Sequence, residues 1–189
     1  MKFLNAKAKV HLKENVIYQV RDKNGKIKPI FQENWLWRLF NKAFSVDIQI
    51  PYLFGNWSNF KLVSNLVTNA GMAGVASRIN GDGAEAVFTY IAVGTGTTAA
   101  AAGNTTLETE STTAGLARAA GTASRVTTDV TNDTAQLVKS FSVTGTVAVT
   151  EAGVLNAASA GTLLNRQVFS AINVVSGDTL QITHKFDCD

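Results

Sequence analysis

At 189 residues the chain is long enough for one well-packed core, or one core with a small appendage. Up to Lys61 it holds eleven of the seventeen Lys and Arg residues and eleven of the sixteen aromatic residues, against four acids. From Leu62 onward it is rich in Ala, Gly, Thr, Val and Ser, with six basic and ten acidic residues. This contrast predicts a basic aromatic anchoring segment (1–61), a helix and turn (62–83) and a β-sandwich domain (84–189).

Some classes of protein are excluded by what the sequence lacks. No uncharged apolar run approaches the ~20 residues that span a bilayer, and the first residues do not form a signal peptide. We therefore expect a protein that is made in a cytoplasm and does not enter a membrane. The single Cys188 excludes an internal disulfide framework, and we expect a free thiol, with an intermolecular bridge as the alternative.

The first segment contains three kinds of pattern. Residues 6–13 alternate between apolar and mostly basic side chains, which predicts a strand with one solvated face. Asn24-Gly25 lies between two strand-like runs and predicts a hairpin turn. Residues 33–44 follow a helical period and predict a short amphipathic helix, whereas residues 48–60 are irregular and aromatic, as in a docking loop.

The basic face of the first strand carries Lys7 and Lys9 and has three interpretations. Lysines keep an exposed sheet edge soluble, steer an acidic protein surface towards the chain, or contact nucleic acid phosphates. We favour the first two over nucleic acid. The apolar side of the helix, with Trp35 and Phe40, is typical of a core or a subunit interface rather than of a membrane surface.

A second helix is predicted at 65–79, and the turn Asn80–Gly83 ends it. Its expected apolar stripe is Leu66, Met72, Val75, Ala76 and Ile79. After it the pattern is β to the end, with strands predicted at 86–93, 116–128, 137–150, 163–174 and 180–186. Several short strands joined by turns predict a mainly β fold, an antiparallel and jelly-roll-like β-sandwich with a basic N-terminal strand and hairpin and one or two short helices.

Within this β region the period of two predicts which side chains are buried. In 137–150 the side chains of Phe141, Val143, Val147 and Val149 should point inward, with a bulge or bend at Gly145. In the last strand the buried side should consist of Leu180, Ile182 and Phe186. His184 has the same parity, so we expect a buried, hydrogen-bonded histidine rather than a metal ligand.

Two glycine-containing motifs admit a chemical interpretation. Gly94–Ala99 formally fits a dinucleotide fingerprint, but only the short run Ala99–Ala102 precedes Gly103 where a helix would be needed, so a flexible loop between strands is favoured. Asn80–Glu85 has oxygen donors but lacks the spacing of a calcium loop. We therefore predict no cofactor and no metal.

The carboxylates Glu108, Glu110 and Glu151 do not form a recognisable glycosidase pair. Carboxylates that are distant in sequence can meet in a fold, so a glycan hydrolase remains the weakest of three hypotheses.

Five stretches together resemble a group of small structural proteins of tailed bacteriophages, variously described as tail, neck, fibre or head-decoration proteins. They are Asn65–Gly71, Phe88–Gly96, Thr144–Gly153, Ala160–Phe169 and Ile172–Ile182. The resemblance covers roughly residues 62–186. It implies a component of the virion, built around a β-sandwich and present in several symmetric copies, and it supplies no catalytic residues.

The first hypothesis is therefore a non-enzymatic structural protein of a tailed phage virion. Its β-domain would form a homo-oligomer, and its N-terminal segment would attach it to a neighbouring head, neck or tail subunit. The residues expected to carry that attachment are Lys7, Lys9, Trp35, Trp37, Phe40, Trp57 and Phe60. The alternative is a receptor- or glycan-binding module on a phage fibre or capsid surface.

Overall fold

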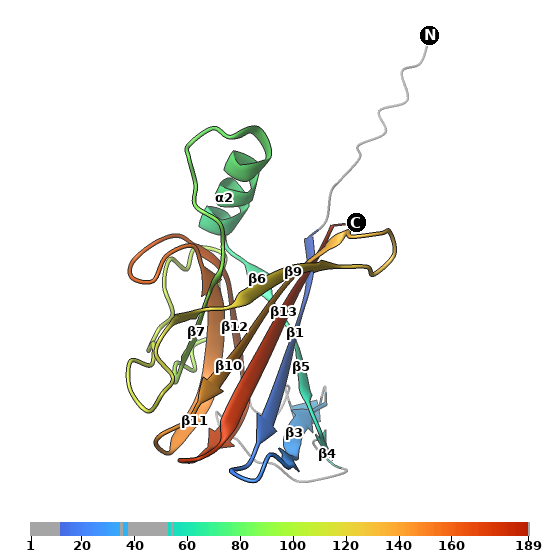
Figure 1. Ribbon diagram of the computed structural model, residues 1–189, viewed down its shortest axis with the longest axis vertical. Coiled ribbons are helices and arrows are strands. Elements are labelled where there is room, and N and C mark those ends of the chain that lie inside the picture. Colours follow the sequence, from blue (N-terminus) through green and yellow to red (C-terminus); the bar gives the residue numbers. More distant parts are fainter. Residues whose placement is uncertain (1–11, 35, 38–52, 54, 189) are drawn as a thin grey trace.

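The described part of the chain is dominated by antiparallel strands that form two facing sheets and one small hairpin. The computed structural model describes residues 12–34, 36–37, 53 and 55–188 (Figure 1). The prediction of a mainly β, antiparallel sandwich is confirmed, and the jelly-roll connectivity stays a prediction. Most of the strand predicted at residues 6–13, most of the helix predicted at 33–44, and Lys7, Lys9, Trp35 and Phe40 lie outside the described residues, while residues 12 and 13 begin β1.

The first sheet has six strands within the described residues, in the order β2-β1-β13-β10-β9, with β5 also paired to β1. Their bounds are β1 Leu12–Arg21, β2 Ile27–Lys28, β5 Lys61–Ser64, β9 Thr122–Val126, β10 Thr134–Ser142 and β13 Thr179–Cys188. β1 pairs with β13 from Leu12 opposite Cys188 to Arg21 opposite Thr179. Residues of the predicted anchoring segment therefore form an integral strand of the sandwich.

The second sheet has five strands in the described chain, in the order β6-β12-β11-β7-β8. Their bounds are β6 Leu66–Val67, β7 Tyr90–Gly94, β8 Ala119–Ala120, β11 Val147–Leu155 and β12 Leu163–Val174. A separate hairpin pairs β3 (Ile30–Glu33) with β4 (Gly55–Ser58). Figure 1 shows this hairpin at one end of the sandwich and the helix α2 at the other.

Two predicted turns are confirmed. The Asn24-Gly25 turn joins β1 to β2, and the Asp22 carboxylate accepts hydrogen bonds from the backbone N–H groups of Asn24 and Lys26. The predicted strand 137–150 bends at Gly145, as expected, but the bend divides it between the two sheets, as β10 and β11.

The core lies between the two sheets and has the side chains that the alternation predicted. Phe141, Val143 and Val149 are buried, and Val147 packs against them. On β13 the inward positions Leu180, Ile182 and Phe186 are buried together with His184. A smaller cluster of Ala92, Leu107, Leu155 and Leu163 lies apart from this core. Leu107 belongs to the loop after β7. That loop is therefore packed onto the protein, whereas the sequence had suggested a flexible loop.

The helix α2 spans Asn69–Asn80, so the predicted helix is confirmed with a later start. Thr68 caps its N-terminus, because its hydroxyl accepts the N–H of Gly71, and Gly81 ends it in the left-handed region with a φ of 77°. The predicted apolar stripe is mostly wrong: Val75 packs partly buried against the core, but Met72 is 50% and Ile79 82% exposed.

Glycines form the buried face of α2 instead, at Gly71 and Gly74. A Cβ on Gly71 would lie 2.1 Å from the backbone oxygen of Leu164, so only glycine lets the helix approach β12 this closely.

Two strand predictions differ from the structure in their bounds. The strand predicted at 86–93 begins only at Tyr90, and the one predicted at 116–128 is divided into the short strands β8 and β9. No helix in the described residues is long and apolar enough to cross a membrane.

Candidate functional site

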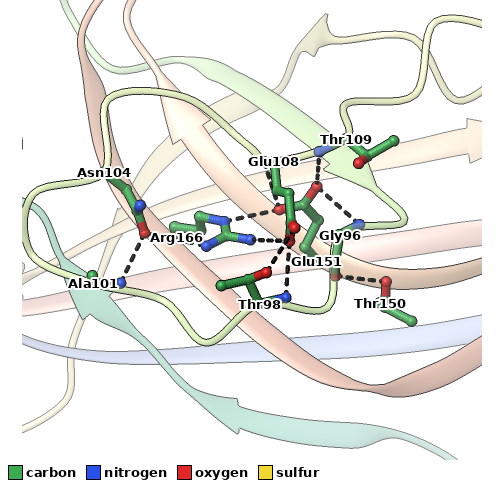
Figure 2. A network of polar contacts seen from close by, with 9 residues as sticks. All are labelled: Gly96, Thr98, Ala101, Asn104, Glu108, Thr109, Thr150, Glu151 and Arg166. Carbon is green, nitrogen blue, oxygen red and sulfur yellow. Dashed lines mark hydrogen bonds and ion pairs between the residues drawn. The ribbon is translucent and has the colours of Figure 1, made fainter.

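A network of polar contacts surrounds an ion pair between Glu151 of β11 and Arg166 of β12 (Figure 2). Both side chains are buried, and the Nε of Arg166 donates to Oε2 of Glu151 at 2.8 Å. The same oxygen accepts the N–H of Glu108 at 3.0 Å, and Oε1 accepts those of Gly96 and Thr109 at 3.1 and 2.7 Å. The carboxylate thus receives four hydrogen bonds, which fill its acceptor sites.

The guanidinium of Arg166 extends the cluster to two further residues. It donates to Oδ1 of Asn104 at 3.2 Å and to Oε2 of Glu108 at 3.3 Å. The Glu108 carboxylate also accepts the N–H and the hydroxyl of Thr98, at 2.8 and 2.7 Å. The hydroxyl of Thr98 is the main cause that lowers the pKa of Glu108, so this carboxyl is ionised at neutral pH.

The Gly94–Ala99 motif has a structural explanation in this cluster. A Cβ on Gly96 would lie 2.6 Å from Oε1 of Glu151 and 2.6 Å from the Cβ of Glu108. Glycine is therefore required so that the loop backbone can reach the buried carboxylate. The N–H of Gly96 already donates to that carboxylate and is not available to a phosphate, which favours the loop interpretation of the motif. We call Glu151, Arg166, Glu108, Thr98, Thr109, Gly96 and Asn104 the loop network.

A separate ion pair fixes the third carboxylate that the sequence singled out. Arg118 binds both oxygens of Glu110, at 2.8 and 2.6 Å, and donates to the carbonyls of Ala157 and Ala160. Glu108, Glu110 and Glu151 are thus each held by a guanidinium rather than arranged as a pair of free carboxylates. Sequence reasoning noticed the three acids but not their arginine partners.

A second buried ion pair connects the two sheets with the β3–β4 hairpin. Lys61 of β5 is fully buried, and its Nζ lies 2.5 Å from Oε2 of Glu33 on β3. The same ammonium donates to the carbonyls of Phe31 and Ser170, and the hydroxyl of Ser170 donates to Glu33 at 2.9 Å. Lys61, counted in the sequence among the cations of the basic segment, is therefore an interior group. The alternation of β5, with Lys61 and Val63 buried, was the available signal.

A cavity of about 630 Å³ lies between these two ion pairs and has Glu33 and Arg166 in its wall. Its other lining residues include Trp37, Val63, Thr97, Thr150, Gln167, Phe169 and Ser170. Gln167 is only 2% exposed, and its Nε2 donates to the hydroxyl of Tyr18. The Oε1 of Gln167 and the indole N–H of Trp37 are both buried and have no hydrogen-bond partner in the part of the chain that the structure describes. We call this space the β12 cavity.

The predicted anchoring residues that the structure describes lie in two places. Trp57 on β4 is 53% exposed and Phe60 is 47% exposed, and Leu62 on β5 is exposed beside them in the sequence. We call Trp57, Phe60 and Leu62 the β4–β5 surface. Trp57 packs edge-on against Phe31, at 5.7 Å between ring centroids. Trp37, by contrast, lines the β12 cavity.

A second hollow of about 350 Å³ lies beside α2 and is mostly apolar. Its wall is built from Val75, Arg78, Ile79, Val87, Phe88, Ala123, Ser124, Ala135, Gln136, Leu137, Leu164, Phe186 and Cys188. Cys188 is exposed there.

His184 is buried on the inner side of β13, as predicted, and stacks on Phe186 with 6.0 Å between ring centroids. Its Nδ1 lies 3.4 Å from Nδ2 of Asn165. Within the described ranges, no group of three His, Cys, Asp or Glu side chains is arranged to hold a metal ion.

The chain matches no family model, no curated protein and no solved structure. The function must therefore be argued from its own residues.

Proposed function

We propose that this protein is a non-enzymatic structural subunit of a larger assembly, and specifically of a tailed phage virion, where it attaches to a neighbouring head, neck or tail subunit. The phage setting rests on the sequence resemblance. The role as a subunit rests on the β4–β5 surface, where Trp57 and Phe60 are each about half exposed within a few residues of one another. Large aromatic side chains of this kind dominate the energetics of protein interfaces.

The position of this surface suits attachment. The surface lies on the β4–β5 segment, at the end of the sandwich away from α2 (Figure 1). The buried Lys61–Glu33 pair and the pairing of β5 with β1 join this segment to the sheets. Because these contacts hold the segment rigidly, less conformational entropy is lost on binding, which favours a stable contact with a partner.

A second feature supports several copies of the chain in contact. β9 is an edge strand of the six-stranded sheet in the described residues, and four of its five residues are exposed. Edge strands offer unpaired N–H and C=O groups that can extend a sheet into another subunit. Homo-oligomerisation through the β-domain is therefore part of the proposal.

The carboxylates favour a structural over a hydrolytic role. A general acid or base must exchange its proton with a substrate, and a nucleophile needs a free oxygen. Glu151 already accepts four hydrogen bonds, and Glu110 is bound on both oxygens by Arg118. These interactions hold backbone segments in place.

The test uses a double variant of the β4–β5 surface, Trp57→Ser with Phe60→Ser. The matched control is Ile79→Ser, which removes an even more exposed apolar side chain from α2. Each variant replaces the wild-type gene in a phage that encodes the chain, and purified particles are immunoblotted. We expect the double variant to stay folded by circular dichroism yet be missing from particles, and the control to be incorporated.

Two outcomes would contradict the proposal. One is normal incorporation of the folded double variant. The other is the absence of the wild-type chain from purified particles.

A further inference from the structure

We propose that the β12 cavity binds a neutral saccharide. This proposal concerns a different part of the molecule from the β4–β5 surface, and it stands or falls independently of the virion role. The cavity of about 630 Å³ has the size typical of a small-molecule site. It lies beside β12, whose pairing with β6 involves only Asn165 and Arg166.

Two unsatisfied polar atoms mark the cavity as a place for a ligand. The Oε1 of Gln167 is a buried acceptor and the Nε1–H of Trp37 is a buried donor, and neither has a hydrogen-bond partner among the residues that the structure describes. Such groups are rare in folded proteins, because leaving one unpaired costs about 1–3 kcal/mol. Both residues line the same cavity, so we expect a ligand there to pair with both groups after a small rotation of the two side chains.

The position of Gln167 is fixed by its surroundings. Its Nε2 donates to the hydroxyl of Tyr18, which leaves the carbonyl oxygen as the group without a partner. The ring of Tyr18 in turn packs on Phe169, with 4.6 Å between centroids. These contacts limit how far the Gln167 side chain moves when a ligand binds, so binding costs little side-chain entropy.

The charges around the cavity select a neutral ligand. The Arg166 guanidinium in its wall is already paired with Glu151 and Glu108, and the nearby Lys61 ammonium is paired with Glu33. These five groups carry three negative and two positive charges, so an anion gains nothing by entering. An ammonium-bearing ligand would have no carboxylate free of an ion pair within this set.

The remaining chemistry fits a sugar hydroxyl. A hydroxyl both donates and accepts, so it can donate to Oε1 of Gln167 and accept from the Trp37 indole. The apolar part of the wall, with Val63 and Phe169, suits the C–H groups of a pyranose ring. A neutral polyhydroxylated molecule therefore matches the donors, the acceptor and the apolar wall together.

The experiment uses the full chain and follows the three tryptophan indole N–H signals by NMR. D-glucose, D-galactose and N-acetyl-D-glucosamine are each titrated to roughly 20 mM, above the Kd on the order of 1 mM expected for a small sugar with few hydrogen bonds. The variant Trp37→Phe identifies the Trp37 signal by its loss. We expect at least one sugar to move that signal saturably without moving that of Trp57, and inorganic phosphate at matched ionic strength to leave it unchanged.

Two variants test the predicted contacts, with affinities measured by the chemical shift changes of the sugar or of cavity backbone amides. Trp37→Phe keeps an aromatic ring but removes the donor, and Gln167→Met keeps the side-chain length but removes the acceptor. Each should weaken binding several-fold to about tenfold. The matched control is Trp57→Phe, which removes an exposed indole and should bind as the wild type does.

Several results would overturn the proposal: no sugar moves the Trp37 signal, phosphate moves it as much as a sugar does, or folded Trp37→Phe protein binds with unchanged affinity. Because Gln167→Met also removes the hydrogen bond to Tyr18, its folding is checked by thermal unfolding. If it does not fold, Trp37→Phe alone decides the outcome.

Discussion

Arg166 borders two polar regions that differ in one respect. In the loop network every hydrogen-bonding site of Glu151 is occupied by the protein itself. In the β12 cavity, one residue further along the same strand, Gln167 has an acceptor that the protein leaves unpaired. A saturated buried group stabilises one structure, whereas an unsaturated one leaves free energy available to a ligand.

The largest loss of stability is expected when the cation of the loop network, Arg166, is removed. Arg166→Met leaves the Glu151 carboxylate buried without its counter-charge, which should reduce the free energy of unfolding by about 3–5 kcal/mol. Urea unfolding followed by fluorescence measures the loss. Arg118→Met is the matched control. Its partner Glu110 is partly exposed, so this substitution should reduce the free energy of unfolding by less.

The double variant Arg166→Met with Glu151→Gln sharpens the result. With both charges removed, part of the lost stability should return, because no buried charge is left uncompensated and the amide oxygen still accepts hydrogen bonds from the loop backbone. A single Arg166→Met variant as stable as the wild type would mean that the loop network does not hold the loop.

A smaller effect is expected from crowding the same network. Gly96→Ala places a methyl group 2.6 Å from the Glu151 carboxylate, which should cost about 1–3 kcal/mol of unfolding free energy. Gly103→Ala lies in the same loop with no atom within 4 Å of its added Cβ, so thermal unfolding should show little change. Equal losses in the two variants would contradict the role given to Gly96.

The smallest expected effect concerns how the stability of the protein depends on pH. The pKa of Glu108 is lowered in the folded protein, chiefly by the Thr98 hydroxyl, from an ordinary value of 4.5. A lowered carboxyl pKa stabilises the fold above the ordinary value, and this contribution disappears as the pH falls through the folded pKa. Glu108→Gln should therefore be less stable than the wild type at pH 7, with a difference that shrinks progressively below about pH 4.5. Urea unfolding at a series of pH values tests this, and a difference that stays constant into acid would contradict it.

Much of the sandwich could be predicted because buried and exposed side chains alternate along a strand that has one face in the core. Leu180, Ile182 and Phe186 are buried where the alternation placed them, and the bounds of β12 match the predicted strand at 163–174. The Asn-Gly turn and the end of α2 at Gly81 depend on local backbone preferences, so they too could be read locally.

The rest depended on contacts between distant segments. The buried face of α2 could not be inferred from apolar side chains, since Gly71 is buried by its backbone contact with Leu164. The sequence marked Glu151 but gave no sign of Arg166, because only the pairing of β11 with β12 brings them together. Lys61 was assigned to the basic segment by composition, whereas the tertiary structure makes it a buried partner of Glu33. Trp37 was predicted as an anchor, and its place beside Gln167 again follows from tertiary contacts.

The pairing of β1 with β13 has a consequence for synthesis in the cell. The ribosome makes β1 before β13, and β13 emerges only after the whole of the chain between the two strands. Until β13 is present, β1 belongs to an incomplete sheet, and its inward side chains, such as Tyr18, are not yet fully buried. Completion of the six-stranded sheet must therefore wait for β13, and deleting β13 should yield an insoluble product rather than a smaller sandwich.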